Sequence, residues 1–430
     1  MKKSLRIYGD NIVECTRFIL ILADSVQGKV QIEKLPKVTT EFLVKNDTLE
    51  MDIKIFPGFG RWSNDIFSIL EKNGSPLKEA PDILVTEVIN KEENLIFSVE
   101  FCSALPAGNQ AWQRHGRGYS ILKAGVPYIF ITHLGGSELT KDRVNKSIRS
   151  PNLLIPFSYL NFSRENDFKF IPIYLPNPGY KRTDLSFRSE LFSSNEDVLK
   201  LFNHLITKKD FPLEIARRIV SKCYHITNDK IKDAENLIYE KFDSHKTTHF
   251  TENNGVKKWK KIITIPHTAT VRKLNIACST YSTELISNKL PFCIILPKDI
   301  KKFVDEMDKI YKVKNIGVSL VPTLPLVVSF VAGFKPKGDD SRPDRGLSPL
   351  IRMLFGEKVN LISIVYGPIN LRMIQKLETD PDKVIKTNGL LSSVFYTSDA
   401  VILDSLTSKT AKIFATKRIK NANLQNKIAE

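Results

Sequence analysis

The sequence predicts an α/β protein made of two domains, and three observations lead to this prediction. The 430 residues exceed the usual size of one domain and suit two. Hydrophobic residues make up 42% of the chain and charged residues 26%, a balance typical of globular proteins with a buried core. Segments with a helical period of hydrophobic residues alternate with segments that have the period of a strand.

The N-terminal region is expected to begin with a strand at 5–8, followed by a helix of about 14 residues. Either Asp10 or Asn11 is expected to cap that helix, because both side chains accept hydrogen bonds from the backbone of a first helical turn. Residues 48–56 alternate hydrophobic and polar side chains, as a half-buried strand does. A short helix is then expected at 64–70.

Two further strands are expected in close succession, at 82–89 and 94–101. The polar turn at 90–93 between them is typical of an antiparallel hairpin. A helix at 109–124 and a buried strand at 126–132 follow. The predicted order is therefore helix, strand, strand, strand, helix, strand.

A segment rich in Pro, Asn and Ser, at 141–195, is interpreted as the boundary region between two domains. It separates a first domain at 1–140 from a second α/β domain at 196–430. The elements expected in the second domain are helical segments at 196–242 and 298–312 and strands at 257–265, 292–296, 316–332 and 359–366.

The charge of the chain is distributed unevenly. The net charge is +17, but residues 1–100 hold 13 basic and 16 acidic residues, a net of −3. Residues 101–430 hold 51 basic and 31 acidic residues, a net of +20. A basic region of this kind attracts polyanions, most often DNA or RNA, and the acidic start is expected if carboxylates there hold a cation. The alternative is a proteome-wide excess of lysine.

Several protein classes are excluded by pattern. No run approaches the roughly 18 apolar residues that a membrane helix needs, and 12–22 is interrupted by Glu14 and Arg17, unlike a signal peptide. The five cysteines form no C-x-x-C pair, so neither a disulfide framework nor a zinc knuckle is indicated. Motifs of ATPases, dinucleotide-binding proteins, zincins and serine hydrolases are missing. A cytoplasmic protein is the simplest expectation.

Two carboxylates of the predicted hairpin point to a metal site. Asp82 opens the first strand and Glu100 lies near the end of the second. The start of one strand faces the end of the other in an antiparallel hairpin, so the two side chains are expected to meet. Carboxylates that converge from rigid elements are the usual ligands of Mg²⁺ at sites of phosphodiester hydrolysis.

These residues resemble the PD-(D/E)XK nuclease superfamily. The signature is similar to Pro81-Asp82, followed by seventeen residues and then Glu100-Phe101-Cys102, and the resemblance covers about 5–135. It implies a restriction-endonuclease-like core of helix, three strands, helix and strand, with Asp82 and Glu100 as metal ligands and Glu14 on the first helix assisting. It also implies polar side chains on the following helix that face the site, and Gln110, Gln113 and Arg114 match.

Cys102 departs from the family pattern, which has lysine, or sometimes Glu or Gln, at this position. A thiol cannot orient water as an ammonium group does. Two hypotheses follow from the departure. Either a cation on the next helix takes over, with Arg114 or Lys123 as the candidates, or the site is inactive.

Three groups of cationic residues are candidates for nucleic-acid contacts. Arg117 could contact phosphates beside the scissile bond, although an amphipathic helix explains it too. Lysines flank Trp259 in a strip typical of phosphate contacts, or else in a solvated strand. A loop at 333–347 could read base edges with its arginines, or be a salt-bridged connection. The residues of the strip and the loop are Lys257, Lys258, Lys260, Arg342 and Arg345.

The sequence thus favours a Mg²⁺-dependent endodeoxyribonuclease that cuts double-stranded DNA, of the type II restriction or a related prokaryotic defence kind. A homodimer is expected, because two strands need two sites. The alternative is a non-catalytic nucleic-acid-binding protein on a decayed nuclease fold. An RNA-processing factor is a third hypothesis, since charge alone does not distinguish DNA from RNA.

Overall fold

The protein has a mixed α/β fold, as the sequence predicts, and the chain divides into two compact units. The first unit comprises 1–107 and 117–231, and the second comprises 108–116 and 232–430. The computed structural model describes residues 1–34, 40–58, 64–77, 79–102, 114–134, 137–139, 146–148, 154–177, 191–222, 259–266, 270–283, 292–311, 320–332, 345–366, 371–380, 383–384, 389–404 and 410–416.

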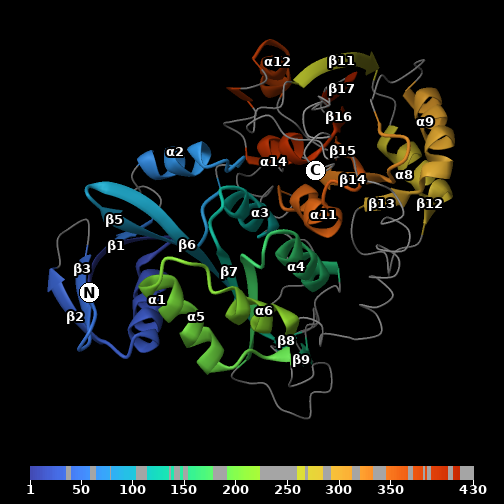
Figure 1. The fold of residues 1–430 in the computed structure, drawn as a ribbon. Coiled ribbons are helices and arrows are strands. Elements are labelled where there is room, and N and C mark those ends of the chain that lie inside the picture. The colour runs from blue at the N-terminus through green and yellow to red at the C-terminus, as the bar shows by residue number, and fades with distance from the viewer. Residues whose placement is uncertain are drawn as a thin grey trace, which may run out of the picture. The chain divides into compact units, whose positions relative to one another are not determined.

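The first unit is built on a mixed eight-stranded sheet with the strand order β10-β7-β6-β5-β1-β4-β3-β2 (Figure 1). β5 and β6 form the predicted antiparallel hairpin, and β7 runs parallel to β6. β8 and β9 form a separate two-stranded sheet. The strands are β1 (Lys2–Gly9), β2 (Lys29–Lys34), β3 (Thr40–Lys45), β4 (Glu50–Pro57), β5 (Ile83–Ile89), β6 (Glu92–Cys102), β7 (Tyr128–Leu134), β8 (Ser137–Leu139), β9 (Lys146–Ile148) and β10 (Phe170–Pro176).

Helices cover both faces of this sheet. On one face, a cluster of rings joins α1, β6 and α5 through Phe18, Phe97 and Phe202, with centroid distances of 5.6 to 5.9 Å. On the other face, Gly118 of α3 lies against Phe170 and Tyr128, and α4 packs on the same rings. The helices are α1 (Ile12–Ser25), α2 (Asn64–Lys72), α3 (His115–Lys123), α4 (Leu154–Glu165), α5 (Asn195–Thr207) and α6 (Leu213–Ser221).

Local sequence explains where α1 begins. Asn11 is its N-cap, and the Asn11 side chain accepts a hydrogen bond from the backbone N–H of Glu14 at 3.0 Å. This decides between the two caps that the sequence allows. Gly9 precedes the helix, and a Cβ there would collide with Cys15, so glycine lets the first turn of α1 approach the end of β1.

The first unit extends further along the chain than the predicted 1–140. The segment 141–195, expected to be a boundary region, contributes α4 and β10, and β10 pairs in parallel with β7. The residues Phe170–Tyr174 are all buried, so this strand needs cover on both faces and finds it in the first sheet.

The helical stretch expected at 196–242 forms two helices, α5 and α6, with Pro212 as the N-cap of α6, and 223–242 lie outside the described residues. The helix expected at 109–124 is described from 115 onward, as α3.

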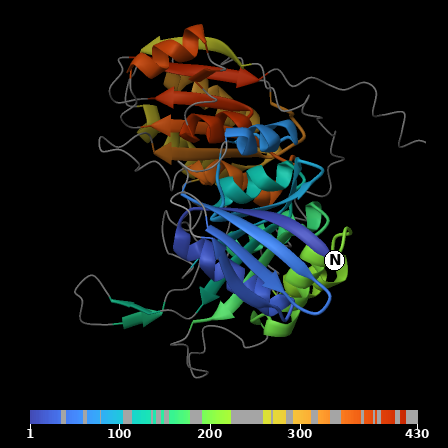
Figure 2. The same cartoon turned by 90° about the vertical axis from the view of Figure 1, so that its left-hand side faces the viewer.

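The second unit is built on a seven-stranded mixed sheet with the strand order β11-β17-β16-β15-β14-β13-β12. Figure 2 shows its strands side by side as a stack of arrows that are mostly orange and red. The strands β14, β15 and β16 are parallel, and the strands on either side of them are antiparallel. The strands are β11 (Trp259–Pro266), β12 (Ser282–Thr283), β13 (Phe292–Ile295), β14 (Leu326–Ala332), β15 (Asn360–Tyr366), β16 (Ala400–Asp404) and β17 (Thr410–Thr416).

Two pairs of helices pack in this unit. The side chains of α8 and α9 form a hydrophobic cluster with one face of the sheet, and α11 and α14 contact each other and the strands. The described helices are α8 (Thr270–Tyr281), α9 (Pro297–Tyr311), α11 (Leu347–Phe355), α12 (Leu371–Thr379) and α14 (Gly389–Thr397). The sequence predicts α9, α11, β11, β13, β14 and β15, whereas α14, β16 and β17 were not predicted.

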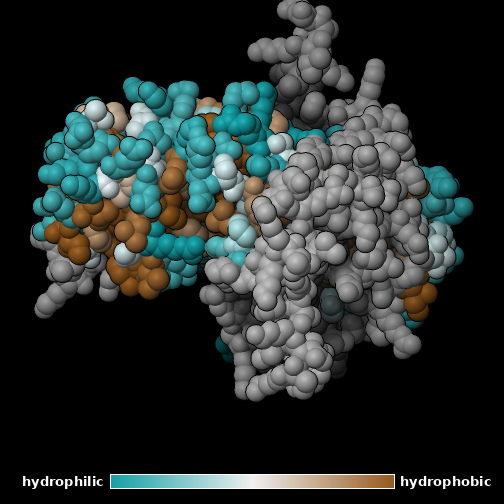
Figure 3. Space-filling view, turned by 90° about the horizontal axis from the view of Figure 1, so that it is seen from below, coloured by the Kyte–Doolittle hydropathy of each residue, from teal (hydrophilic) through white to brown (hydrophobic). Residues whose placement is uncertain are grey.

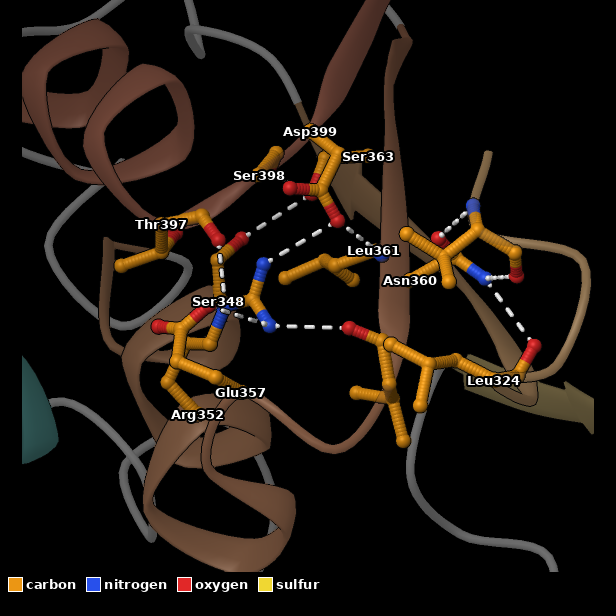
Figure 4. A network of polar contacts seen from close by, with 12 residues as sticks. Leu324, Ser348, Arg352, Glu357, Asn360, Leu361, Ser363, Thr397, Ser398 and Asp399 are labelled. Atoms are coloured by element: carbon orange, nitrogen blue, oxygen red, sulfur yellow. Dashed lines mark hydrogen bonds and ion pairs between the residues drawn. The ribbon is translucent and has the colours of Figure 1, made fainter. Parts of the chain in front are cut away.

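A buried arginine holds three of these elements together (Figure 4). Arg352 of α11 donates from Nε to the carbonyl of Thr397 at 2.6 Å and from Nη1 to the carbonyl of Val359 at 3.1 Å. Its Nη2 lies 3.3 Å from the carboxylate of Asp399, which also accepts the backbone N–H of Leu361 at 2.8 Å. The network satisfies the backbone groups at the end of α14 and the start of β15, so its role is structural.

The surface combines hydrophilic and hydrophobic residues. On the face shown in Figure 3, brown hydrophobic patches lie between teal hydrophilic ones. Two large hydrophobic side chains of α1 are well exposed, Val13 at 71% and Leu20 at 54%. In the part of the chain that the structure describes, no helix is long and apolar enough to cross a membrane.

Candidate metal centre

The predicted pair of carboxylates meets in the first sheet, where β5 begins and β6 ends. The backbone N–H of Asp82 donates to Oε2 of Glu100 at 3.2 Å, and the backbone N–H of Phe101 donates to Oδ2 of Asp82 at 2.9 Å. The hairpin register, with Ile83 opposite Val99, places the two acids on neighbouring strands. Both are buried, Asp82 at 5% exposure and Glu100 at 0%. The structure therefore brings together the two residues that the sequence pairs.

Arg117 of α3 lies between these carboxylates. Its Nη1 is 2.8 Å from Oδ1 of Asp82 and 2.6 Å from Oε1 of Glu100. Burial lowers the pKa of Arg117, but the charges of Glu100 and Asp82 raise it by more, so the guanidinium stays charged. The sequence predicts Arg117 as a phosphate contact, whereas here it is the counter-ion of the buried acids.

A second group of acids forms on the other side of Asp82. One carboxylate oxygen from each of Asp10, Glu14 and Asp82 lies within 4.8 Å of the others. Asp10 reaches this place because β1 pairs with β5, and its backbone N–H donates to the carbonyl of Asp82 at 3.0 Å. Glu14 comes from the first turn of α1. Three carboxylates at this spacing are a donor set for a hard divalent cation such as Mg²⁺.

Glu14 carries the evidence that this group suits a cation. Its Oε2 is buried and has no hydrogen-bond partner in the described part of the chain. Burial, followed by the charges of Asp82 and Asp10, raises the pKa of Glu14 to about 7. Three acids held this close repel one another, and a divalent cation among them removes that repulsion.

The candidate metal ligands differ in one residue from the predicted ligands Glu14, Asp82 and Glu100. Asp10 takes the place of Glu100, because Glu100 faces Arg117 on the opposite face of the sheet from α1. The sequence offers Asp10 only as a candidate helix cap. The sequence feature that indicates Asp10 is its place directly after the first strand, whereas the pairing of that strand with β5 is decided by the tertiary structure.

The sequence names Lys123 and Arg114 as candidate cations for the site. Lys123 is exposed at the last turn of α3, 5.5 Å from the ring centroid of Tyr119 and six residues beyond Arg117, about 9 Å along the helix. Arg114 lies half-buried in the turn before α3. Cys102 is buried at the end of β6. The cation that lies between the two carboxylates is Arg117.

The other predicted contacts are only partly described. Gln113, Lys257, Lys258 and Arg342 lie outside the described residues, and Lys260 belongs to β11 with its side chain outside them. Arg345 precedes α11 and is half-buried. Its guanidinium covers Gly389, where a Cβ would be 2.7 Å from Cζ of Arg345. Arg345 therefore packs on the start of α14 instead of extending from a loop.

The chain was compared with protein-family models, with curated proteins and with solved structures, and no match was found in any of the three.

Proposed function

We propose that the first unit is a Mg²⁺-dependent endodeoxyribonuclease of the restriction or defence kind, acting on double-stranded DNA. The observation that carries the proposal is the juxtaposition of two groups at one sheet edge. Asp10, Glu14 and Asp82 form an acidic group, and Glu100 with Arg117 lies directly beside it. Phosphodiester hydrolysis needs both a divalent cation and compensation of negative charge.

The order of elements supports the resemblance to PD-(D/E)XK nucleases. In chain order, the helix α1, the strand β4, the hairpin β5–β6 with Asp82 and Glu100, the helix α3 and the parallel strand β7 match the expected core, with β2, β3 and α2 as additional elements between α1 and β5. One departure concerns the neighbour of β5. β1, which precedes the helix, lies between β4 and β5 in the sheet. This departure explains why Asp10 lies next to Asp82, because Asp10 directly follows β1 and β1 pairs with β5.

In the proposed reaction, Asp10, Glu14 and Asp82 would hold Mg²⁺. The cation would polarise the phosphate and lower the pKa of a bound water. Ionised Glu14 is required for this, so cation binding should release the proton that burial keeps on it. Glu100 holds the guanidinium of Arg117 next to Asp82. Arg117 replaces the family lysine in this scheme, as a fixed positive charge next to the developing negative charge.

The second unit is assigned to DNA recognition or assembly in this proposal. Its residues, 108–116 and 232–430, hold 33 basic and 20 acidic side chains, a net charge of +13, which favours contact with a polyanion. We extend the proposal to a homodimer, because cutting both strands of a duplex needs two sites.

The test is incubation of the purified full-length protein with plasmid DNA, in Mg²⁺ or in EDTA. We expect Mg²⁺-dependent cutting by the wild type and none by Asp82→Asn, which keeps the size of the side chain and removes its charge. Asp47→Asn, in an exposed turn of the same unit, is the matched control and should cut normally. Cutting by Asp82→Asn at the wild-type rate, or cutting in EDTA, would contradict the proposal.

A second candidate function has one observation in its favour. The observation is that Arg117 already pairs with both Asp82 and Glu100, as in a site that no longer binds metal, next to a Cys102 where the resembled family usually has lysine. The protein would then bind nucleic acid without cutting it. Tight DNA binding by the wild type with no cleavage in Mg²⁺ or Mn²⁺ would favour this function over the first.

A further inference from the structure

The side chain of Arg17 is placed unusually for an arginine beside acidic residues. It lies one turn after Glu14 on α1, and Glu14 belongs to the acidic group. Residues three apart on a helix are neighbours and readily form ion pairs. Yet Arg17 makes no hydrogen bond or ion pair to any residue that the structure describes, and its side chain is exposed.

The ring of Phe101 holds Arg17 in this position instead. The guanidinium carbon lies 4.6 Å from the ring centroid, within the range of a cation–π contact. The backbone N–H of Phe101 donates to Asp82, so the residue that supports the guanidinium also fixes a carboxylate of the acidic group. Stacking on a ring uses the face of the guanidinium and leaves its N–H edges available to an acceptor.

His133 is the titratable group of β7 that lies near Arg17. On β7, His133 is half-buried near the same sheet edge, and burial together with the charge of Arg17 lowers its pKa. The imidazole is therefore neutral at neutral pH, and the positive charge here is that of Arg17. A phosphate is the anion that planar, bidentate guanidinium groups match best.

We propose that Arg17 binds a DNA backbone phosphate next to the one at the acidic group, with Phe101 as the platform that presents the guanidinium. This inference rests on the proposed function, because it takes the acidic group as the place of the scissile phosphate. Arg17 is a binding residue in this scheme and does not act on the reacting atoms. It sets where the backbone lies relative to Asp82 and Glu14.

The test measures DNA binding without cleavage, by fluorescence anisotropy of a labelled mixed-sequence duplex in EDTA at several NaCl concentrations. Arg17→Ala should raise Kd roughly tenfold, as expected for a lost hydrogen bond to a charged group. It should also reduce the slope of log Kd against log salt by about 1, since one phosphate contact disappears. Arg17→Lys should keep the wild-type slope, because the charge stays.

The matched control is Arg217→Ala. Arg217 is also exposed, and its guanidinium lies 5.3 Å from the ring centroid of Phe168, but it is on α6 and pairs with Glu214. Its substitution should leave Kd and the salt slope unchanged. Equal Kd and slope for Arg17→Ala and wild type would overturn the inference, as would a wild type that does not bind the duplex.

The outcome is independent of the cleavage test. If the wild type binds but never cuts, and Arg17→Ala weakens binding as expected, the nuclease proposal fails and the phosphate contact stands. If the wild type cuts and Arg17→Ala binds like the wild type, the phosphate contact fails and the nuclease proposal stands.

Discussion

The substitution Glu14→Gln tests the electrostatics of the acidic group, since it keeps the shape of the side chain and removes its charge. Burial and the charges of Asp82 and Asp10 raise the pKa of Glu14 from 4.5 to about 7. A carboxyl with a raised pKa in the folded state favours folding when it is protonated. The contribution of Glu14 to stability is therefore fully present below about pH 4.5 and is lost as the pH rises through about 7.

The magnitude follows from the difference between the two pKa values. It corresponds to at most about 3 kcal/mol of unfolding free energy. Glu14 is only partly buried, so solvent screening reduces this figure, and we expect about 1–2 kcal/mol. Between about pH 4.5 and pH 8, the unfolding free energy of the wild type should therefore fall by about 1–2 kcal/mol relative to that of Glu14→Gln.

Urea unfolding followed by circular dichroism, in EDTA at several pH values, measures this difference. Glu196→Gln is the matched control, because Glu196 lies exposed in the first turn of α5 and its substitution should give a much smaller change with pH. Mg²⁺ at about pH 8 should stabilise the wild type and not Glu14→Gln, since the cation binds the ionised carboxyl. A wild-type-to-variant difference that is constant with pH would refute the reasoning.

Three further predictions concern other residues. Arg117→Ala should abolish cleavage, whereas Lys123→Ala and Cys102→Ser should keep most of it, and plasmid cutting distinguishes them; an active Arg117→Ala would remove this residue from the mechanism. Arg352→Ala should lower the unfolding free energy by about 3–5 kcal/mol, because it leaves buried partners unpaired, and a loss below about 1 kcal/mol in urea unfolding would contradict the role of the network. If Arg345 reads bases, Arg345→Ala should relax the cleavage pattern, whereas its packing on Gly389 predicts a lower melting temperature and an unchanged pattern.

Local sequence was sufficient for the hairpin of the first unit and for the pair of acids on it. Two strand-like segments rich in hydrophobic residues on either side of a polar turn predict β5 and β6, and the geometry of a hairpin then makes Asp82 and Glu100 neighbours. The turn itself is shorter than the predicted 90–93, because β6 begins at Glu92. The cap of α1 was also local, although the sequence allowed Asp10 as well as Asn11. These features depend on residues close together in the chain, so periodicity and turn chemistry specify them.

The partners of Asp82 depended on contacts between distant parts of the chain. β1 inserts between β4 and β5 and so brings Asp10 to Asp82, and α3 turns Arg117 toward both hairpin acids instead of toward solvent. No period in the sequence encodes which strand pairs with which, because many pairings bury similar hydrophobic surface. The tertiary structure alone therefore decided which acids gather at the site and which cation neutralises them.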